Sequence, residues 1–157
     1  MTKLCRNLKK FSEEIGSLAA IIGVCVGIIG FGFTIFQIKS ANNTLQATNA
    51  YQIQKDAREL AAEVSRDEIL LKALNGAKLN DAESNSLQKT IWKMNNFYLS
   101  VFRQSSARGI SREFSSAFAR DFCDFHKRKI IAESWVAMRN VGMVSQDHQN
   151  MKEIWCD

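Results

Sequence analysis

Four residues in the carboxyl-terminal part of the chain have side chains that could bind a metal ion: Cys123, His126, His148 and Cys156. Two thiolates and two imidazoles can hold zinc tetrahedrally, but structural zinc sites usually join paired ligands through short turns. Here the gaps between successive ligands are 2, 21 and 7 residues. We therefore predict no metal site and no cofactor, with Cys123 buried and His126 on the surface. A disulfide between Cys123 and Cys156 is an alternative if this part of the chain faces an oxidising compartment.

Side chains for acid, base or nucleophilic catalysis are few. The chain has only two histidines, and it lacks a G-x-S-x-G motif, an H-E-x-x-H motif and a glycine loop for phosphate. Two acidic pairs, Asp67 with Glu68 and Asp121 with Asp124, could act as general acid and base, but such pairs are common on solvated helix faces. The sequence therefore predicts a protein that is not an enzyme and has no catalytic residues.

One basic cluster, residues 126–129 with Arg120 before it, could bind acidic headgroups, a nucleic acid or an acidic protein. Basic side chains near a helix carboxyl terminus also stabilise that end through the helix dipole, which is the commoner situation. Residues 39–157 contain 17 Lys and Arg against 14 Asp and Glu, a net charge of +3. This charge is too small and too scattered for a nucleic-acid partner, and none is predicted.

The amino-terminal part contains a long uncharged run. No Asp, Glu, Lys, Arg or His occurs in the 24 residues from Ile15 to Ile38. As a helix this run is roughly 36 Å long, enough to cross a hydrocarbon core of about 30 Å. A cleavable signal has a shorter apolar region, of about 7 to 15 residues. We predict a basic tail over residues 1–14, a retained transmembrane helix over residues 15–38 and a helical domain over residues 39–157.

The charges that flank this run do not decide its orientation. Four basic residues precede it (Lys3, Arg6, Lys9 and Lys10), and three follow within about twenty residues (Lys39, Lys55 and Arg58). The positive-inside rule compares such counts, and four against three is no useful difference. The side of the membrane on which the domain lies therefore stays open.

Small residues recur through the uncharged run at spacings of 4, 3, 4, 3 and 4. They are Gly16, Ala20, Gly23, Gly27, Gly30 and Thr34, here called the small-residue seam. A 3.5-residue repeat keeps one helix face towards a partner, and small side chains allow two helices to approach closely. Glycine is also frequent in membrane helices in general. We predict that the span self-associates through this seam, giving a homo-oligomer in membrane lipid.

The rest of the chain has helical periodicity, no long strand-like alternation and no proline. We expect a helix leaving the membrane, a short helix from a capping box at Ser65 to Asn75-Gly76, and a long helix from a second box at Asn80 to Gly109. Ser111 should cap a helix whose phenylalanines 114, 118, 122 and 125 enter the core. A helix over about 130–141 and a last one from Ser145 follow. The predicted fold is all-α, a transmembrane helix followed by a small helical bundle.

Several short motifs resemble a widespread bacterial family of uncharacterised small membrane proteins. They are residues 37–39, 43–47, 51–52, the Ser65 box, the segment after Asn80 and residues 96–103. The resemblance implies one amino-terminal span in the bacterial cytoplasmic membrane and a helical domain on the cytoplasmic side. It implies no activity and no site residues. The basic tail and the proline-free carboxyl-terminal region depart from that family's pattern.

Two functions from different classes fit these features. The first is a non-enzymatic single-pass membrane protein whose helical domain binds a protein partner and whose span self-associates. The alternative is a small membrane effector, of the toxin or phage-defence type, that perturbs the bilayer once it assembles. The partner and the trigger are not encoded in any motif of the sequence.

Overall fold

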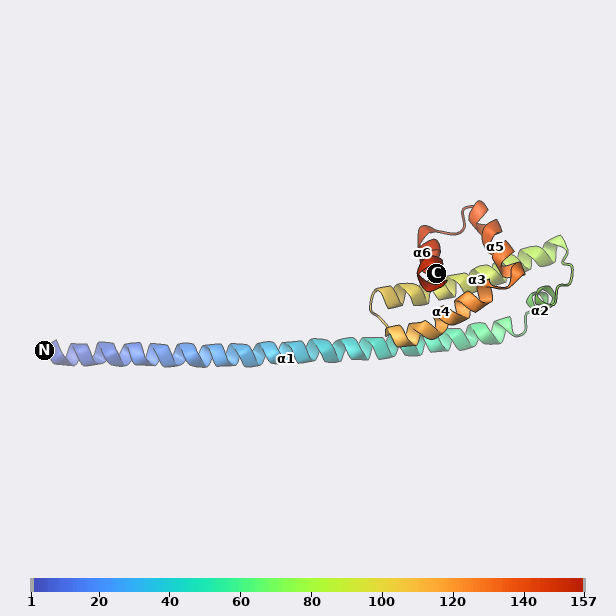
Figure 1. Ribbon diagram of the computed structural model, residues 1–157. Helices are drawn as coiled ribbons and strands as arrows, with labels where there is room; N and C mark the ends of the chain where they lie inside the picture. The colour runs from blue at the N-terminus through green and yellow to red at the C-terminus, as the bar shows by residue number, and fades with distance from the viewer. Residues whose placement is uncertain (1, 157) are drawn as a thin grey trace. The chain divides into compact units, whose positions relative to one another are not determined.

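The computed structural model describes the backbone of residues 2–156 and the side chains of residues 27–156. This part of the chain is helical and contains no strand, which confirms the predicted all-α class (Figure 1). The helices are α1 (Thr2–Val64), α2 (Glu68–Leu74), α3 (Asp81–Ser106), α4 (Arg112–His126), α5 (Lys129–Asn140) and α6 (Gln146–Cys156). Contacts between residues divide the chain into two units, residues 1–44 and residues 45–157.

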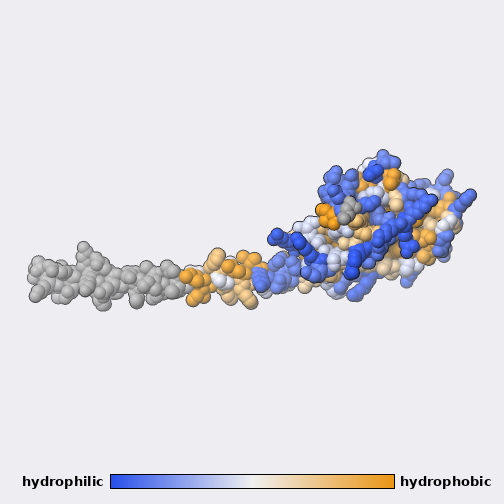
Figure 2. All heavy atoms as spheres, in the orientation of Figure 1, coloured by the Kyte–Doolittle hydropathy of each residue, from blue (hydrophilic) through white to orange (hydrophobic). Residues whose placement is uncertain are grey.

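The first unit exposes a series of large apolar side chains. Between Ile28 and Ile38 on α1, seven isoleucines and phenylalanines are between 51% and 72% exposed, and Figure 2 shows them as an orange band. The basic tail and the first half of the predicted span, residues 15–26, lie outside the described side chains. Within the described residues, no helix combines the length and the apolar character that crossing a membrane requires.

The second unit is built around α3, which contacts α2, α4, α5 and α6. Its inward face carries Leu87, Ile91 and Leu99, each at most 4% exposed, against Phe122 of α4 and Trp135 of α5. Leu87, Ile91 and Leu99 are separated by four and eight positions, which places them on one face of a helix. A second apolar cluster joins Ile53, Val101 and Ile110, and Phe114 and Phe118 pack against it.

The phenylalanine stripe of α4 enters the core only in part. Phe122 is fully buried, whereas Phe114, Phe118 and Phe125 are half-buried. Phe114 and Phe118 contact the Ile53 cluster, and Phe125 packs on the edge of the main core. The predicted face is correct, but one short helix spans the boundary between two clusters and cannot bury every ring equally.

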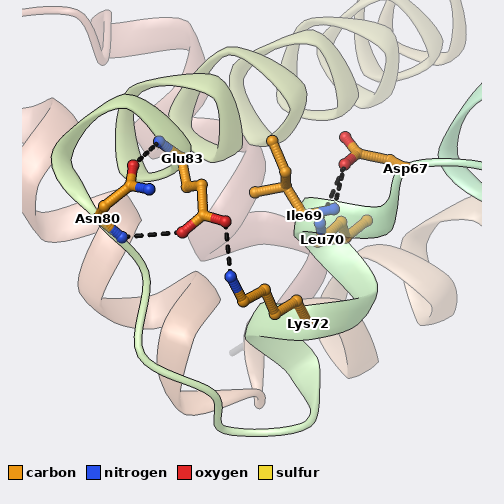
Figure 3. A network of polar contacts seen from close by, with 6 residues as sticks. All are labelled: Asp67, Ile69, Leu70, Lys72, Asn80 and Glu83. Carbon is orange, nitrogen blue, oxygen red and sulfur yellow. Dashed lines mark hydrogen bonds and ion pairs between the residues drawn. The ribbon is translucent and has the colours of Figure 1, made fainter.

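Helix caps fix where α2 and α3 begin (Figure 3). Asn80 Oδ1 accepts from the Glu83 amide, and the Asn80 amide donates to Glu83 Oε2, each at 2.9 Å, which confirms the predicted capping box. Lys72 Nζ of α2 lies 2.6 Å from Glu83 Oε1. This ion pair and the Asn80 amide lower the pKa of Glu83. One carboxylate therefore closes the box and joins α2 to α3.

The capping box predicted at Ser65 is wrong. Ser65 continues the last turn of α1, where its amide donates to the Ala61 carbonyl and its hydroxyl donates to Ala62. Asp67 caps α2 instead, accepting from the amides of Ile69 and Leu70 at 3.0 Å (Figure 3). A carboxylate is the better acceptor at the positive end of a helix, so the start of α2 moves two residues along the chain.

The end of α3 differs from the predicted stop at Gly109. Arg108 has a φ of 59°, the left-handed conformation that usually favours glycine. Its amide donates to Ser105 and that of Gly109 donates to Gln104, the two bonds of a Schellman motif. Gly109 is in a crowded position: a Cβ there would lie 2.7 Å from Gln104 Oε1, the end of a flexible side chain that would have to shift, and 3.3 Å from the Gln104 carbonyl oxygen. The glycine and the left-handed residue are therefore neighbours and not the same residue.

Replacing Asn80 by Ala should lower the free energy of unfolding of the full-length protein in detergent by about 1 kcal/mol, because it removes the acceptor of the capping box. Asn85→Ala is the matched control, since Asn85 is exposed inside α3 and alanine favours helix. Urea unfolding followed by circular dichroism measures both. Equal stability of the two variants would contradict the structural role of the box.

Candidate functional site

A crevice of about 750 Å³ lies on the second unit. The end of α3, the α3–α4 connection, the start of α4 and the end of α6 line it, together with Gln46 of α1. This volume lies in the range of small-molecule sites. We call it the α3–α4–α6 crevice.

The charged side chains that line the crevice are both arginines, Arg108 and Arg112. Six lysines and arginines elsewhere in the described part of the chain form ion pairs with carboxylates. Neither crevice arginine forms an ion pair with a carboxylate of the described residues. The crevice is therefore a positively charged depression without an internal counterion.

Five serines surround these arginines: Ser105, Ser106, Ser111, Ser115 and Ser116. Ser111 caps α4 by accepting from the Phe114 amide at 3.1 Å, as predicted. Ser115 is 5% exposed, and its hydroxyl lies 2.8 Å from that of Ser105 and donates to the Arg112 carbonyl. The buried hydroxyl pair thus joins α3 to α4 at the crevice.

Apolar side chains complete the lining. Phe102 of α3 and Trp155 of α6 pack edge to face with ring centroids 5.6 Å apart. Ile110 is buried, whereas Ile154 is 69% exposed. The crevice therefore places an uncovered apolar side chain in the same lining as two unpaired cations.

A disulfide between Cys123 of α4 and Cys156 of α6 holds this part of the fold, with Cα atoms 5.5 Å apart. Trp155, which lines the crevice, directly precedes Cys156. The bond fixes the end of α6 beside α4 and so restrains one wall of the crevice. The bond also uses both sulfur atoms that a zinc site at Cys123, His126, His148 and Cys156 would need as ligands. In the described part of the chain, no group of three or more His, Cys, Asp or Glu residues could hold a metal ion.

The other candidate residues of the sequence have structural contacts. Burial raises the pKa of Asp67, but hydrogen bonds from Thr90 and from the amides of Leu70 and Ile69 outweigh it and lower the pKa. Asp124 forms an ion pair with Lys127 at 2.7 Å. Lys129 lies 3.9 Å from Glu133. The acidic pairs and the basic cluster are thus partly used in caps and surface ion pairs.

His126 was expected on the surface, and this prediction is wrong. It is 7% exposed, and its Nε2 donates to Asn95 Oδ1 at 3.0 Å. Its ring lies 4.3 Å from that of Phe122 and 4.9 Å from that of Trp135, measured between centroids. The Lys-Arg-Lys run that follows His126 suggests exposure to solvent. His126 lies instead in the last turn of α4 on the same face as Phe122, so the core encloses its ring.

The second histidine is also buried. His148 of α6 is 3% exposed, shares a 2.8 Å hydrogen bond with Ser145, and packs against Trp92 with centroids 4.9 Å apart. The atoms His126 Nδ1, His148 Nε2 and Asn95 Nδ2 are buried without a hydrogen-bond partner in the described structure. Burial lowers the pKa of His126 to about 4, with a smaller contribution from Lys152. Burial, and then Arg103, lower the pKa of His148.

The small-residue seam lies partly outside the described side chains, since Gly16, Ala20 and Gly23 precede residue 27. At Gly27 and Gly30 an added Cβ would meet no atom within 4 Å. The Thr34 hydroxyl donates to the Gly30 carbonyl of its own helix at 2.9 Å. Gly27, Gly30 and Thr34 lie on one side of α1, as their spacing requires.

Reasoning from the sequence missed the crevice. A local signal was present, since seven of the twelve residues from Ser105 to Ser116 are serine or arginine. Such a segment looks like an ordinary polar connection between helices. What makes it a depression is the packing of α6 beside it, 30 or more residues later in the chain.

No family model matches the chain, and no curated protein or solved structure is similar to it.

Lowering the pH should destabilise the second unit already at pH values well above those at which its carboxylates become protonated. A histidine whose pKa is lower in the folded state favours folding above its unfolded pKa of about 6.5, and this stability is lost as the pH falls. With a folded pKa of about 4, His126 alone should account for a loss of about 2 kcal/mol between pH 7.5 and pH 5. Urea unfolding of the full-length protein in detergent at several pH values measures this loss.

The variant His126→Gln provides the control. Glutamine keeps a donor for Asn95 but does not titrate, so its stability should change much less over this pH range. Burial also lowers the pKa of His148, so the free energy of unfolding of the variant should still depend weakly on pH. Identical pH dependence in the variant and the parent would refute the role of His126.

Proposed function

We propose that the chain is a single-pass protein of the bacterial cytoplasmic membrane, with a helical domain that acts by binding and not by catalysis. The observation that carries this proposal is the uncovered apolar segment of α1, residues 28–38, with seven large side chains more than half exposed. Burying each such side chain is worth about 1.5 to 3 kcal/mol, so covering all seven would gain roughly 10 kcal/mol or more. These side chains continue the uncharged run that begins at Ile15, and lipid is the medium that covers them on every side of the helix.

A binding role fits the second unit because its candidate catalytic groups are engaged in other contacts. Asp67 caps a helix, Asp124 pairs with Lys127, and both histidines are buried. Three apolar side chains near the end of α5 and beyond it are 42% to 73% exposed: Val136, Val141 and Met143. Contiguous exposed apolar groups mark protein contact sites, and these three residues lie within eight positions of the chain. A protein partner is therefore part of the proposal.

The disulfide between Cys123 and Cys156 favours a domain on the oxidising side of the membrane. Disulfides persist outside the cytoplasm, where thiols are not kept reduced. The family resemblance implies the opposite, a cytoplasmic domain. We give the disulfide more weight because it is a bond within this chain, whereas the resemblance covers short motifs. The basic tail before the span then lies on the cytoplasmic side, in the sense of the positive-inside rule.

Two measurements test the anchor and the orientation separately. The full-length protein should remain in the pellet after alkaline carbonate washing and ultracentrifugation of bacterial membranes. A carboxyl-terminal fusion to alkaline phosphatase, which becomes active only after export, should be active, and a matched fusion to a cytoplasm-dependent fluorescent protein should be dark.

Recovery of the intact chain in the carbonate supernatant would overturn the membrane anchor. A pelleted protein with an inactive phosphatase and a bright fluorescent fusion would instead retain the anchor and reverse the orientation. In that case the cysteines should react with a maleimide in freshly lysed cells, since the cytoplasm keeps thiols reduced.

The seam proposal concerns the span itself. Replacing Gly23 and Gly27 together with Ile should lower the signal of a membrane oligomerisation reporter by about tenfold, because the larger side chains keep two helices apart. The control replaces Ile22 and Ile29, which lie off the seam, with Leu, and should leave the signal unchanged. Equal signals from both variants would exclude self-association through the seam.

A further inference from the structure

We infer that the α3–α4–α6 crevice binds an amphiphile that carries a phosphate group and an apolar chain. This inference goes beyond the proposed function, because it assigns a ligand class to a site that neither membrane anchoring nor a protein partner requires. It rests on the charge, the backbone and the apolar lining of the crevice.

Charge is the first argument. Arg108 and Arg112 line the crevice, and none of the carboxylates among the described residues lines it. Six lysines and arginines of the described chain form ion pairs, such as Lys72 with Glu83 and Arg103 with Asp147, whereas Arg108 and Arg112 are among the cations that form none. Arginine's planar fork of donors suits phosphate oxygens. An anionic ligand would supply the counterion that these two side chains lack.

The backbone of Arg108 is the second argument. Its φ of 59° is unfavourable in a residue with a Cβ, and glycine would avoid this cost. The conformation is held by the Gln46 side chain, whose Nε2 donates to the Arg108 carbonyl at 3.0 Å, and by the Schellman bonds. Arginine at this position makes the fold less stable than glycine would, but it places a charged side chain at the crevice.

The apolar lining is the third argument and defines the rest of the ligand. Phe102, Ile110 and Trp155 provide an aromatic and aliphatic wall, and Ile154 beside them is 69% exposed. A volume of about 750 Å³ exceeds that needed by an inorganic anion and suits a drug-sized molecule. A phosphate head with an apolar chain matches both halves of the lining. The head can come from a membrane phospholipid or from a soluble phosphate ester.

The test uses the full-length protein in phosphatidylcholine nanodiscs, titrated with octyl phosphate by calorimetry, with empty nanodiscs subtracted. Octyl phosphate should bind saturably with one site per chain. Octyl glucoside, which has an uncharged head, should not bind, and inorganic phosphate should bind at least tenfold more weakly than octyl phosphate.

Two variants remove the charges by different routes. Arg108→Gly should weaken binding of octyl phosphate about tenfold, the equivalent of one charge-assisted contact, while it raises or preserves the melting temperature. Arg112→Gln should weaken binding by a similar factor. Arg139→Gln removes an exposed arginine of α5 that does not line the crevice, and its affinity should stay within twofold of the parent.

A competition experiment separates the two sources of the ligand. If a membrane phospholipid supplies the head, nanodiscs that contain phosphatidic acid should abolish the heat of octyl phosphate binding. If the ligand is a soluble ester, that heat should persist. The inference is overturned if octyl phosphate shows no saturable binding, if inorganic phosphate binds equally well, or if Arg108→Gly remains folded and binds like the parent.

Discussion

The packing of Phe122 between helices is the contact on which the rest of the second unit depends. Its ring is fully buried and lies within 6.4 Å, between centroids, of the rings of Tyr98, His126, Trp135 and Trp155. These residues come from α3, α4, α5 and α6, so one side chain of a short helix joins four elements. Aromatic pairs in edge-to-face geometry add to the burial of apolar area. The inner face of α3 therefore packs on a single apolar surface formed by α4, α5 and α6.

The same packing encloses polar groups whose hydrogen-bond capacity is not fully used. Asn95 and His126 satisfy each other through one bond, and each retains a buried nitrogen without a partner in the described structure. A buried polar group without a partner costs stability, and a buried charge costs more. The core therefore favours the neutral form of both histidines. This requirement ties the stability of the helical unit to the pH of the compartment in which it lies.

The disulfide and the crevice meet at the end of α6. Cys156 is bonded to α4, while Ile154 and Trp155 just before it line the crevice. A short terminal helix usually frays, but a covalent bond to its last residue prevents this. Arg108 of the α3–α4 connection and Arg112 at the start of α4 thus share the crevice with a wall that is held in place. Rigid positioning of this kind lowers the entropy lost when a ligand binds.

The sequence by itself determined the all-α class, the capping box at Asn80, the cap at Ser111 and the face of α4 that is apolar, because caps and helical periodicity depend on residues within a few positions of one another. The uncharged run and the small-residue seam are likewise visible in the sequence alone. The cap at Asp67 and the left-handed Arg108 were missed, since neighbouring residues compete for each role and the full geometry of the turn selects one. Only the tertiary structure decided that His126 is buried, that Cys123 bonds to Cys156 and that a crevice lies beside α6. These features depend on contacts between helices, such as that of His126 with Asn95, 31 positions away, and the bond between Cys123 and Cys156, 33 positions apart, which local spacing cannot encode.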